Sequence, residues 1–169
     1  MIRNRRDARE RALQFLFQND LNPPMDLAKD LKEFWKTQRL EAEDRKQDGP
    51  TYGEQPELPE LTAEETSMVM FAESLIQGVV TDIESLDEEI GRYAKNWDVH
   101  RMPVVDRNIL RLAIYELLHR NDIPPVSTIN EAIEIAKKFS SPESGKFING
   151  VLDRVKTTLS RAPRTAAEE

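Results

Sequence analysis

The chain has 169 residues, of which 33% are charged, and its net charge is −7. It has no cysteine, which excludes a disulfide framework, a zinc–thiolate site and a thiol nucleophile. No run approaches the roughly 18 consecutive apolar residues of a membrane span, and no apolar stretch of a secretory signal follows the basic N-terminus. We therefore expect one small domain in the cytoplasm, with no membrane contact.

The first half of the chain predicts two helices and a linker. The first helix covers residues 4–19 and is ended by Pro23 and Pro24. Asp26 is expected to cap a second helix, which runs into the acidic segment 41–61. That segment contains proline and glycine without an apolar period, so it is predicted to be a mobile linker.

The second half predicts five more helices. Thr62 begins one of them with capping-box spacing, and a short helix with its own apolar stripe follows it. Residues 104–119 are apolar nearly all round, which is typical of a helix in the middle of a bundle. Capping-box spacing at Thr128 is expected to open the next helix, and Ser141 before Pro142 opens the last.

The predicted fold class is therefore all-α, with about seven helices and no convincing strand. We expect one domain over residues 1–169, built from two packed sub-bundles. The N-terminal sub-bundle would cover residues 1–81 and the C-terminal one residues 82–161, followed by a frayed tail at 162–169.

Catalytic and metal-binding patterns are weak in this chain. Glu116 and His119 have the Glu-x-x-His spacing of carboxylate-bridged di-iron bundles, but such sites need a second pair, and the sequence has none. His119 is also expected at a helix C-terminus, where a positive charge is favourable. Since the glycines are scattered and no Ser-His-Asp set is supported, we predict no enzyme activity, no metal and no cofactor.

The charge is unevenly distributed, and this distribution carries more information. Residues 1–11 contain five arginines and two acids, and residues 137–161 contain six bases and two acids. Residues 41–65, by contrast, contain nine acids and two bases. An acidic body repels nucleic acid, so RNA binding would need a local basic site at one of the two ends.

Each end offers one candidate site. Arg5, Arg6 and Arg9 span an arc of about 100° on a helix, which makes one patch suited to phosphate oxygens. Phe17 lies two turns further along an edge of this patch, where it would either stack on a base or pack in the core. Lys146 follows the start of the last helix, whose backbone N–H groups can hold an anion. From spacing alone, a solvated helix start and ordinary capping remain open alternatives.

Several blocks of the sequence resemble the NusB family of bacterial transcription antitermination factors. The opening with Arg5, Arg6 and Arg9 is similar to the arginine-rich start of that family. Three further blocks occur in the family's order, at residues 106–117, at 123–124 with 129–137, and at 146–153. Residues 37–62 look longer and more acidic than is usual in the family.

The resemblance implies a function as well as a fold of two perpendicular helical bundles. Family members pair with NusE, a ribosomal small-subunit protein, and bind the boxA sequence of nascent ribosomal RNA leaders. They thereby help the RNA polymerase antitermination complex to resist termination, and some form homodimers. The alternatives are a helical protein–protein adaptor without direct RNA binding and a metal-binding bundle.

The resemblance also assigns site residues by position. It implies RNA-binding roles for Arg5, Arg6, Arg9, Phe17, Lys146 and Phe147. It implies partner-binding roles for Asp106 and Glu143. Phe17 stands where the family often has tyrosine.

Overall fold

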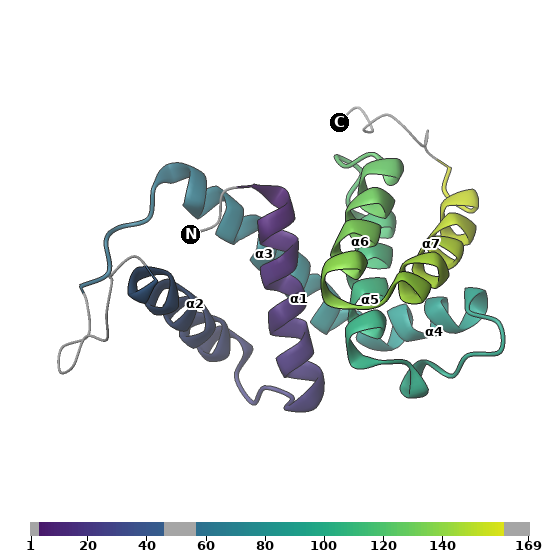
Figure 1. Ribbon diagram of the computed structural model, residues 1–169, viewed down its shortest axis with the longest axis horizontal. Coiled ribbons are helices and arrows are strands. Elements are labelled where there is room, and N and C mark those ends of the chain that lie inside the picture. Colours follow the sequence, from purple (N-terminus) through teal and green to yellow (C-terminus); the bar gives the residue numbers. More distant parts are fainter. Residues whose placement is uncertain (1–3, 46–56, 161–169) are drawn as a thin grey trace.

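The computed structural model describes residues 4–45 and 57–160 (Figure 1). The described part consists of helices and contains no strand. Its elements are α1 (Arg5–Leu21), α2 (Leu27–Asp44), α3 (Ala63–Thr81), α4 (Ile83–Tyr93), the 3-10 helix η1 (Val99–Arg101), α5 (Val104–His119), α6 (Pro125–Phe139) and α7 (Pro142–Thr157). The predicted all-α fold with seven helices is confirmed. The predicted tail at 162–169 and residues 46–56 of the predicted linker lie outside the described residues.

Most helices begin at the residues whose chemistry predicts it. Asp26 caps α2 by accepting a hydrogen bond from the Lys29 backbone N–H at 3.1 Å. Thr62 and Glu65 form a complete capping box at the start of α3. Ser141 caps α7, and Pro142 occupies its first turn.

The predicted start of α6 at Thr128 is wrong. The helix begins three residues earlier, at Pro125, because proline has the backbone angle of a first helical residue. The Thr128 hydroxyl is therefore not needed as a cap, and it donates to the Glu116 carboxylate of α5 at 2.5 Å.

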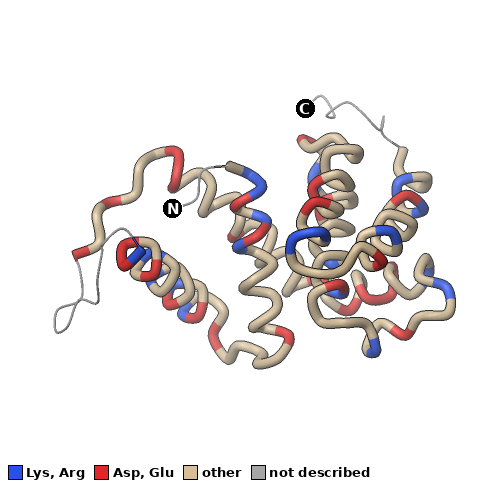
Figure 2. Tube along the Cα trace, viewed as in Figure 1, with Lys and Arg blue, Asp and Glu red and all other residues tan. Residues whose placement is uncertain are grey.

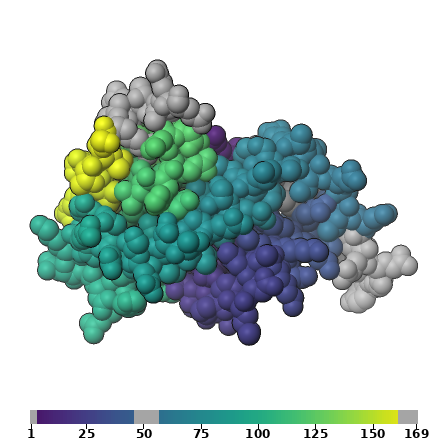
Figure 3. Space-filling model, turned by 180° about the vertical axis from the view of Figure 1, so that it is seen from behind, coloured from purple at the N-terminus to yellow at the C-terminus, as the bar shows by residue number. Residues whose placement is uncertain are grey.

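Helix α5 is the centre of the fold. It packs against α1, α3, α4, α6 and α7, and ten of its 16 residues are buried. On the α3 side the approach is very close, since a Cβ added to Gly78 would lie 1.9 Å from the Tyr115 ring. Seen from behind, α3 and α4 form a band between α2 and the α6–α7 pair (Figure 3). The prediction of a central helix from its all-round apolar pattern therefore agrees with its observed packing.

Helix α2 is attached to α1 and α3 by long side chains. The Phe34 ring meets Phe15 of α1 edge to face, with ring centroids 5.4 Å apart. The Trp35 indole N–H donates to the Glu73 carboxylate of α3 at 2.8 Å. A boundary between two sub-bundles at residues 81 and 82 remains a prediction, because α1 and α3 pack on α5 as well as on each other.

Ile114 tests the central position of α5. Its side chain is fully buried, so Ile114→Ala removes apolar contacts and leaves a cavity. We expect the free energy of unfolding, measured with denaturant, to fall by about 2–5 kcal/mol. Leu118→Ala, on the exposed side of the same helix, is the control and should cost less than about 1 kcal/mol. Similar losses for the two variants would contradict this packing.

Candidate nucleic-acid interface

Arg5 and Arg6 are exposed in the first turn of α1. Asn4 begins this turn by accepting a hydrogen bond from the Asp7 backbone N–H at 2.9 Å. The turn faces the start of α6 across a cleft of about 500 Å³, whose walls include Ile123, Pro124 and Ser127. In Figure 2 the beginning of α1 is basic.

Arg6 is held in this cleft by Glu131 of α6. Its Nε and Nη2 atoms donate to the two carboxylate oxygens of Glu131 at 2.7 and 2.8 Å. These hydrogen bonds, together with the arginine charge, lower the pKa of Glu131 below its ordinary value. Arg6 is thereby oriented, and its guanidinium remains partly exposed.

Arg9 lines the same cleft as Arg5 and Arg6 but, unlike them, is buried, so the three predicted arginines come together with only two of them exposed. It is only 6% exposed, because it points from α1 toward α5. Its Nε and Nη2 atoms bind both oxygens of the buried Glu116 carboxylate at 2.8 and 2.7 Å. Thr128 donates to the same carboxylate, so the pair joins α1, α5 and α6. The RNA-binding role of Arg9 stays a prediction.

A different arginine lies beside the α1 turn. Arg5, Arg9 and Arg120 place their guanidinium carbons 5.1, 5.3 and 5.0 Å from the centroid of the Phe71 ring. Arg120 also forms a two-point pair with Asp122 at 2.8 and 2.9 Å. Sequence reasoning missed Phe71 and Arg120, because they lie on or after other helices and belong to no local motif. We call Arg5, Arg6 and Arg120 the arginine cluster.

Phe17 lies outside the buried core and is half-buried on α1. Leu21, one turn further along the helix, is exposed. The two side chains therefore present apolar surface on α1. Whether Phe17 stacks on RNA stays a prediction.

Asp106 lies in the first turn of α5 and contacts a second group of predicted site residues, at the start of α7. It is only 4% exposed and accepts hydrogen bonds from the Ser140 and Ser144 hydroxyls at 2.6 and 2.7 Å. The carboxylate thus fixes the α6–α7 junction to the first turn of α5. Its partner-binding role stays a prediction, and in this arrangement Asp106 would act by positioning its neighbours.

The other members of this group lie on the first turns of α7. Glu143 and Lys146 are exposed, whereas Phe147 is half-buried against the core. The Phe147 ring also contacts Trp97, with centroids 5.5 Å apart. Trp97 is 55% exposed and follows Asn96, whose φ of 69° turns the chain after α4. The sequence offered only a tryptophan in a loop as a signal for this residue.

The two groups are not adjacent. The arginine cluster lies beside the start of α6, and the Lys146 group follows its end. A helix of 15 residues is about 22 Å long. The two groups therefore lie toward opposite ends of α6.

Glu116 and His119 do not form a metal site in this structure. Glu116 is bound to Arg9, while His119 lies 3.5 Å from the Asp82 carboxylate and stacks on Tyr115. Over residues 4–45 and 57–160 no three His, Cys, Asp or Glu side chains are grouped so that they could hold a metal ion. Within the same ranges, no helix is both long and apolar enough to cross a membrane.

Comparison with known proteins identifies the family. A model of the NusB family matches residues 6–157. The chain belongs to the NusB family. The transcription antitermination protein NusB of Thermodesulfovibrio yellowstonii is 39% identical over 158 residues, covering 89% of this chain and 90% of the relative. NusB of Desulfitobacterium hafniense strain DCB-2 is 41% identical over 158 residues, covering 94% of this chain and 91% of the relative.

Solved structures agree with this NusB-family assignment. T. maritima NusB is similar with a TM-score of 0.72 and 34% identity, covering 95% of this chain and 96% of that one. A structure of the antitermination factors NusB and NusE in complex with dsRNA has a TM-score of 0.67 and 24% identity. It covers 94% of this chain and 100% of that one, and at this identity it supports the fold alone.

The different burial of Arg9 and Arg5 gives a matched pair of variants. Arg9→Ala leaves the Glu116 carboxylate buried without its cation, so we expect a loss of about 3–5 kcal/mol in the free energy of unfolding. Arg5→Ala removes one exposed guanidinium from the Phe71 ring and should cost at most about 1 kcal/mol. Denaturant unfolding of both variants measures the difference. Equal losses would show that the Arg9–Glu116 pair does not hold α1 in place.

Asp106 gives a second test of a buried charge. Asp106→Lys removes the acceptor of both serine hydroxyls and buries a cation, so we expect a loss of about 3 kcal/mol or more in unfolding free energy. Asp106→Asn keeps one acceptor oxygen and should lose less. Thermal unfolding followed by circular dichroism compares them. An Asp106→Lys variant as stable as the parent would mean that the carboxylate is free to contact a partner directly.

Proposed function

We propose that this protein is a transcription antitermination factor that pairs with NusE and binds boxA-type RNA of nascent ribosomal RNA leaders. The pair would help the RNA polymerase antitermination complex to resist termination. The observation that carries the RNA part is the arginine cluster on an otherwise acidic chain of net charge −7. The names of the relatives, which are transcription antitermination proteins, support the assignment. The role is binding and not catalysis, and it belongs in the cytoplasm, where bacterial RNA is made.

The proposed RNA surface begins at the arginine cluster. Arg5 contacts the Phe71 ring but has no hydrogen-bond or ion-pair partner among the described residues, so it can bind phosphate without breaking a hydrogen bond or an ion pair. Arg6 is already oriented by Glu131 and still has a free edge for phosphate. Lys146 would provide a further phosphate contact beyond the end of α6. The Trp97–Phe147 pair beside it offers aromatic faces on which bases can stack.

The proposed partner surface lies at the start of α7. Glu143 is exposed there, and Asp106 fixes the segment that carries it. We propose that NusE contacts this segment, with Asp106 as a positioning residue. A second copy of the chain is the competing occupant, and adding NusE should dissociate such a homodimer if the surface is shared.

A helical adaptor without direct RNA contact is the alternative function. It predicts that the exposed arginines only increase solubility. RNA affinity measured with and without NusE separates the two readings, because an adaptor would show no affinity of its own for boxA.

Salt dependence tests the phosphate contacts. If Arg5, Arg6 and Lys146 each neutralise one phosphate, the logarithm of the boxA affinity should fall with the logarithm of salt at a slope of about −2. Arg9 is left out because it is bound to Glu116. The Arg5→Ala and Arg6→Ala double variant should bind more weakly, with a slope shallower by about 1.4.

The control variant removes the same amount of positive charge from helix α2. Lys29 and Lys32 are exposed on the first turns of α2, and their replacement by alanine should leave the slope unchanged. Fluorescence anisotropy with labelled boxA RNA in the presence of NusE measures the RNA affinity of the parent, the arginine double variant and the lysine control. Equal affinity for the parent and the arginine double variant would leave only the adaptor function.

A further inference from the structure

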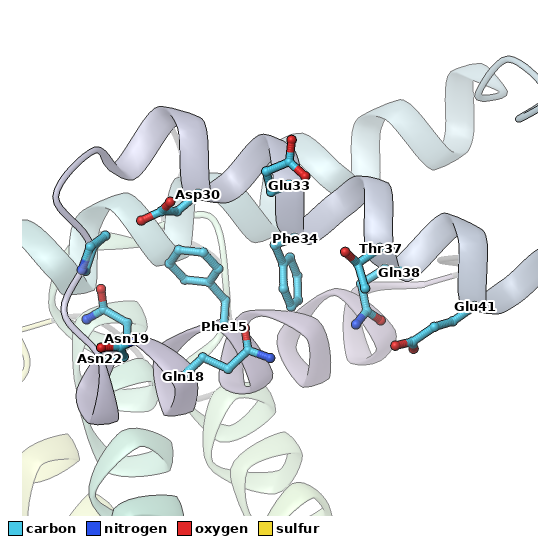
Figure 4. Close-up of a pocket in the computed structure, with 11 residues that line it drawn as sticks. Phe15, Gln18, Asn19, Asn22, Asp30, Glu33, Phe34, Thr37, Gln38 and Glu41 are labelled. Atoms are coloured by element: carbon cyan, nitrogen blue, oxygen red, sulfur yellow. The ribbon is translucent and has the colours of Figure 1, made fainter. Parts of the chain in front are cut away.

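A second cleft, of about 410 Å³, lies between α1 and α2 (Figure 4). In Figure 1, α1 separates it from α6, so it is distinct from the proposed RNA surface. Phe15 of α1 and Phe34 of α2 point into the space between the two helices and meet edge to face. The two rings form the floor of the cleft and are only 4% and 7% exposed, so they offer apolar contact to the stem of a bound side chain.

The walls of the cleft are rich in hydrogen-bond acceptors and lack cations. None of its 11 lining residues is lysine or arginine, while Asp30, Glu33 and Glu41 contribute carboxylates. Gln38, at one end, already accepts a hydrogen bond from the guanidinium of Arg11. An arginine side chain is thus a ligand for which this wall has the right chemistry.

Asn19 supplies an independent indication of a ligand. It lines the cleft and is only 9% exposed. Its Oδ1 atom is the one buried side-chain nitrogen or oxygen without a hydrogen-bond partner in the described part of the chain. Because buried polar groups are nearly always hydrogen-bonded, this acceptor takes its donor from a water molecule or from a ligand at the cleft.

The dimensions of the cleft favour an extended ligand. Its α2 wall runs from Asp30 to Glu41, which is about 16 Å along the helix axis. At about 3.3 Å per residue, five residues of extended peptide cover that length. Carboxylates stand near both ends of the wall, and alternate side chains of an extended peptide face the same side, so two basic side chains separated by three residues would meet them together.

We propose that the α1–α2 cleft binds a basic, arginine-containing peptide segment of a partner protein. One arginine would lay its apolar stem on the Phe15–Phe34 floor and donate toward Asn19 and Asp30, and a second basic group would meet Glu41. This site does not depend on the proposed RNA-binding function, and the two can be tested separately.

The test uses the full chain, labelled with ¹⁵N, and the pentapeptide acetyl-Arg-Ala-Ala-Ala-Arg-amide. We expect saturable shifts of the Asn19 side-chain amide and of the α1 and α2 backbone signals that border the cleft. The same peptide with citrulline in place of arginine has nearly the same shape without the charge. It should bind roughly fivefold or more weakly, since two partly exposed ion pairs are lost.

Two variants separate binding from folding. Asp30→Asn with Glu41→Gln should weaken the arginine peptide roughly fivefold or more, whereas Glu84→Gln with Glu88→Gln on α4 removes the same charge and should not. The Asn19→Ala variant should also bind the peptide more weakly. Its free energy of unfolding should not fall below that of the parent, because the substitution removes an acceptor that has no hydrogen-bond partner within the chain. A purely structural Asn19 would instead lose stability.

Three results would overturn the proposal. The first is an absence of saturable shifts at the cleft, and the second is equal binding of the arginine and citrulline peptides. The third is tighter binding of spermidine than of the peptide at the same signals, which would assign the cleft to a free polyamine. RNA affinity of the Asn19→Ala variant should equal that of the parent, so failure here leaves the RNA proposal unaffected.

Discussion

The buried charges of α5 are the constraint on which the rest of the structure depends. Glu116 binds Arg9 near the start of α1, while Arg107 and Arg111 bind Asp20 near its end at 2.7 and 3.1 Å. A buried charge without its partner is strongly destabilising, so both ends of α1 must stay in register with α5. Burial alone would raise the pKa of Asp20, but the hydrogen bonds from Arg107 and Asn108 and the nearby arginine charges lower it overall. The rotation of α1 is thereby fixed, and with it the direction of every other side chain on the helix.

This fixed rotation divides the arginines of α1 between two roles. Arg9 points inward, where its planar guanidinium satisfies both oxygens of a buried carboxylate. Arg5, one turn earlier, remains exposed, and Arg6 is turned toward α6. Because both buried ion pairs resist rotation of α1, the exposed arginines are presented to a ligand in a preorganised position. The buried Arg9–Glu116 pair thus holds in place the turn that carries the exposed arginines.

Helices and most of their ends were predictable from sequence, because apolar periods and caps act over a few residues. Asp26, Thr62 and Ser141 are such local signals. The partners of the charged side chains were not predictable, since Arg9 and Glu116 are 107 positions apart and Asp106 and Ser144 are 38 apart. The same limit explains the error at Thr128: capping-box spacing described a local possibility, but the hydroxyl serves a carboxylate on another helix. An arc of 100° on a helix is also wide enough to cross the boundary between core and surface, which is why Arg9 is buried while Arg5 and Arg6, in the same cleft, stay exposed.

Helix α1 separates two surfaces of opposite charge. On the α6 side lies the arginine cluster, and on the α2 side lies a cleft whose charged lining residues are all acidic. A helix with its side chains is about 10–12 Å across, while charges in physiological salt are screened over about 8 Å. Each surface therefore interacts with its own ligand with little influence from the other. The acidic cleft repels RNA and the arginine cluster repels a basic peptide, so the net charge of −7 is compatible with two ligands of opposite charge on one small domain.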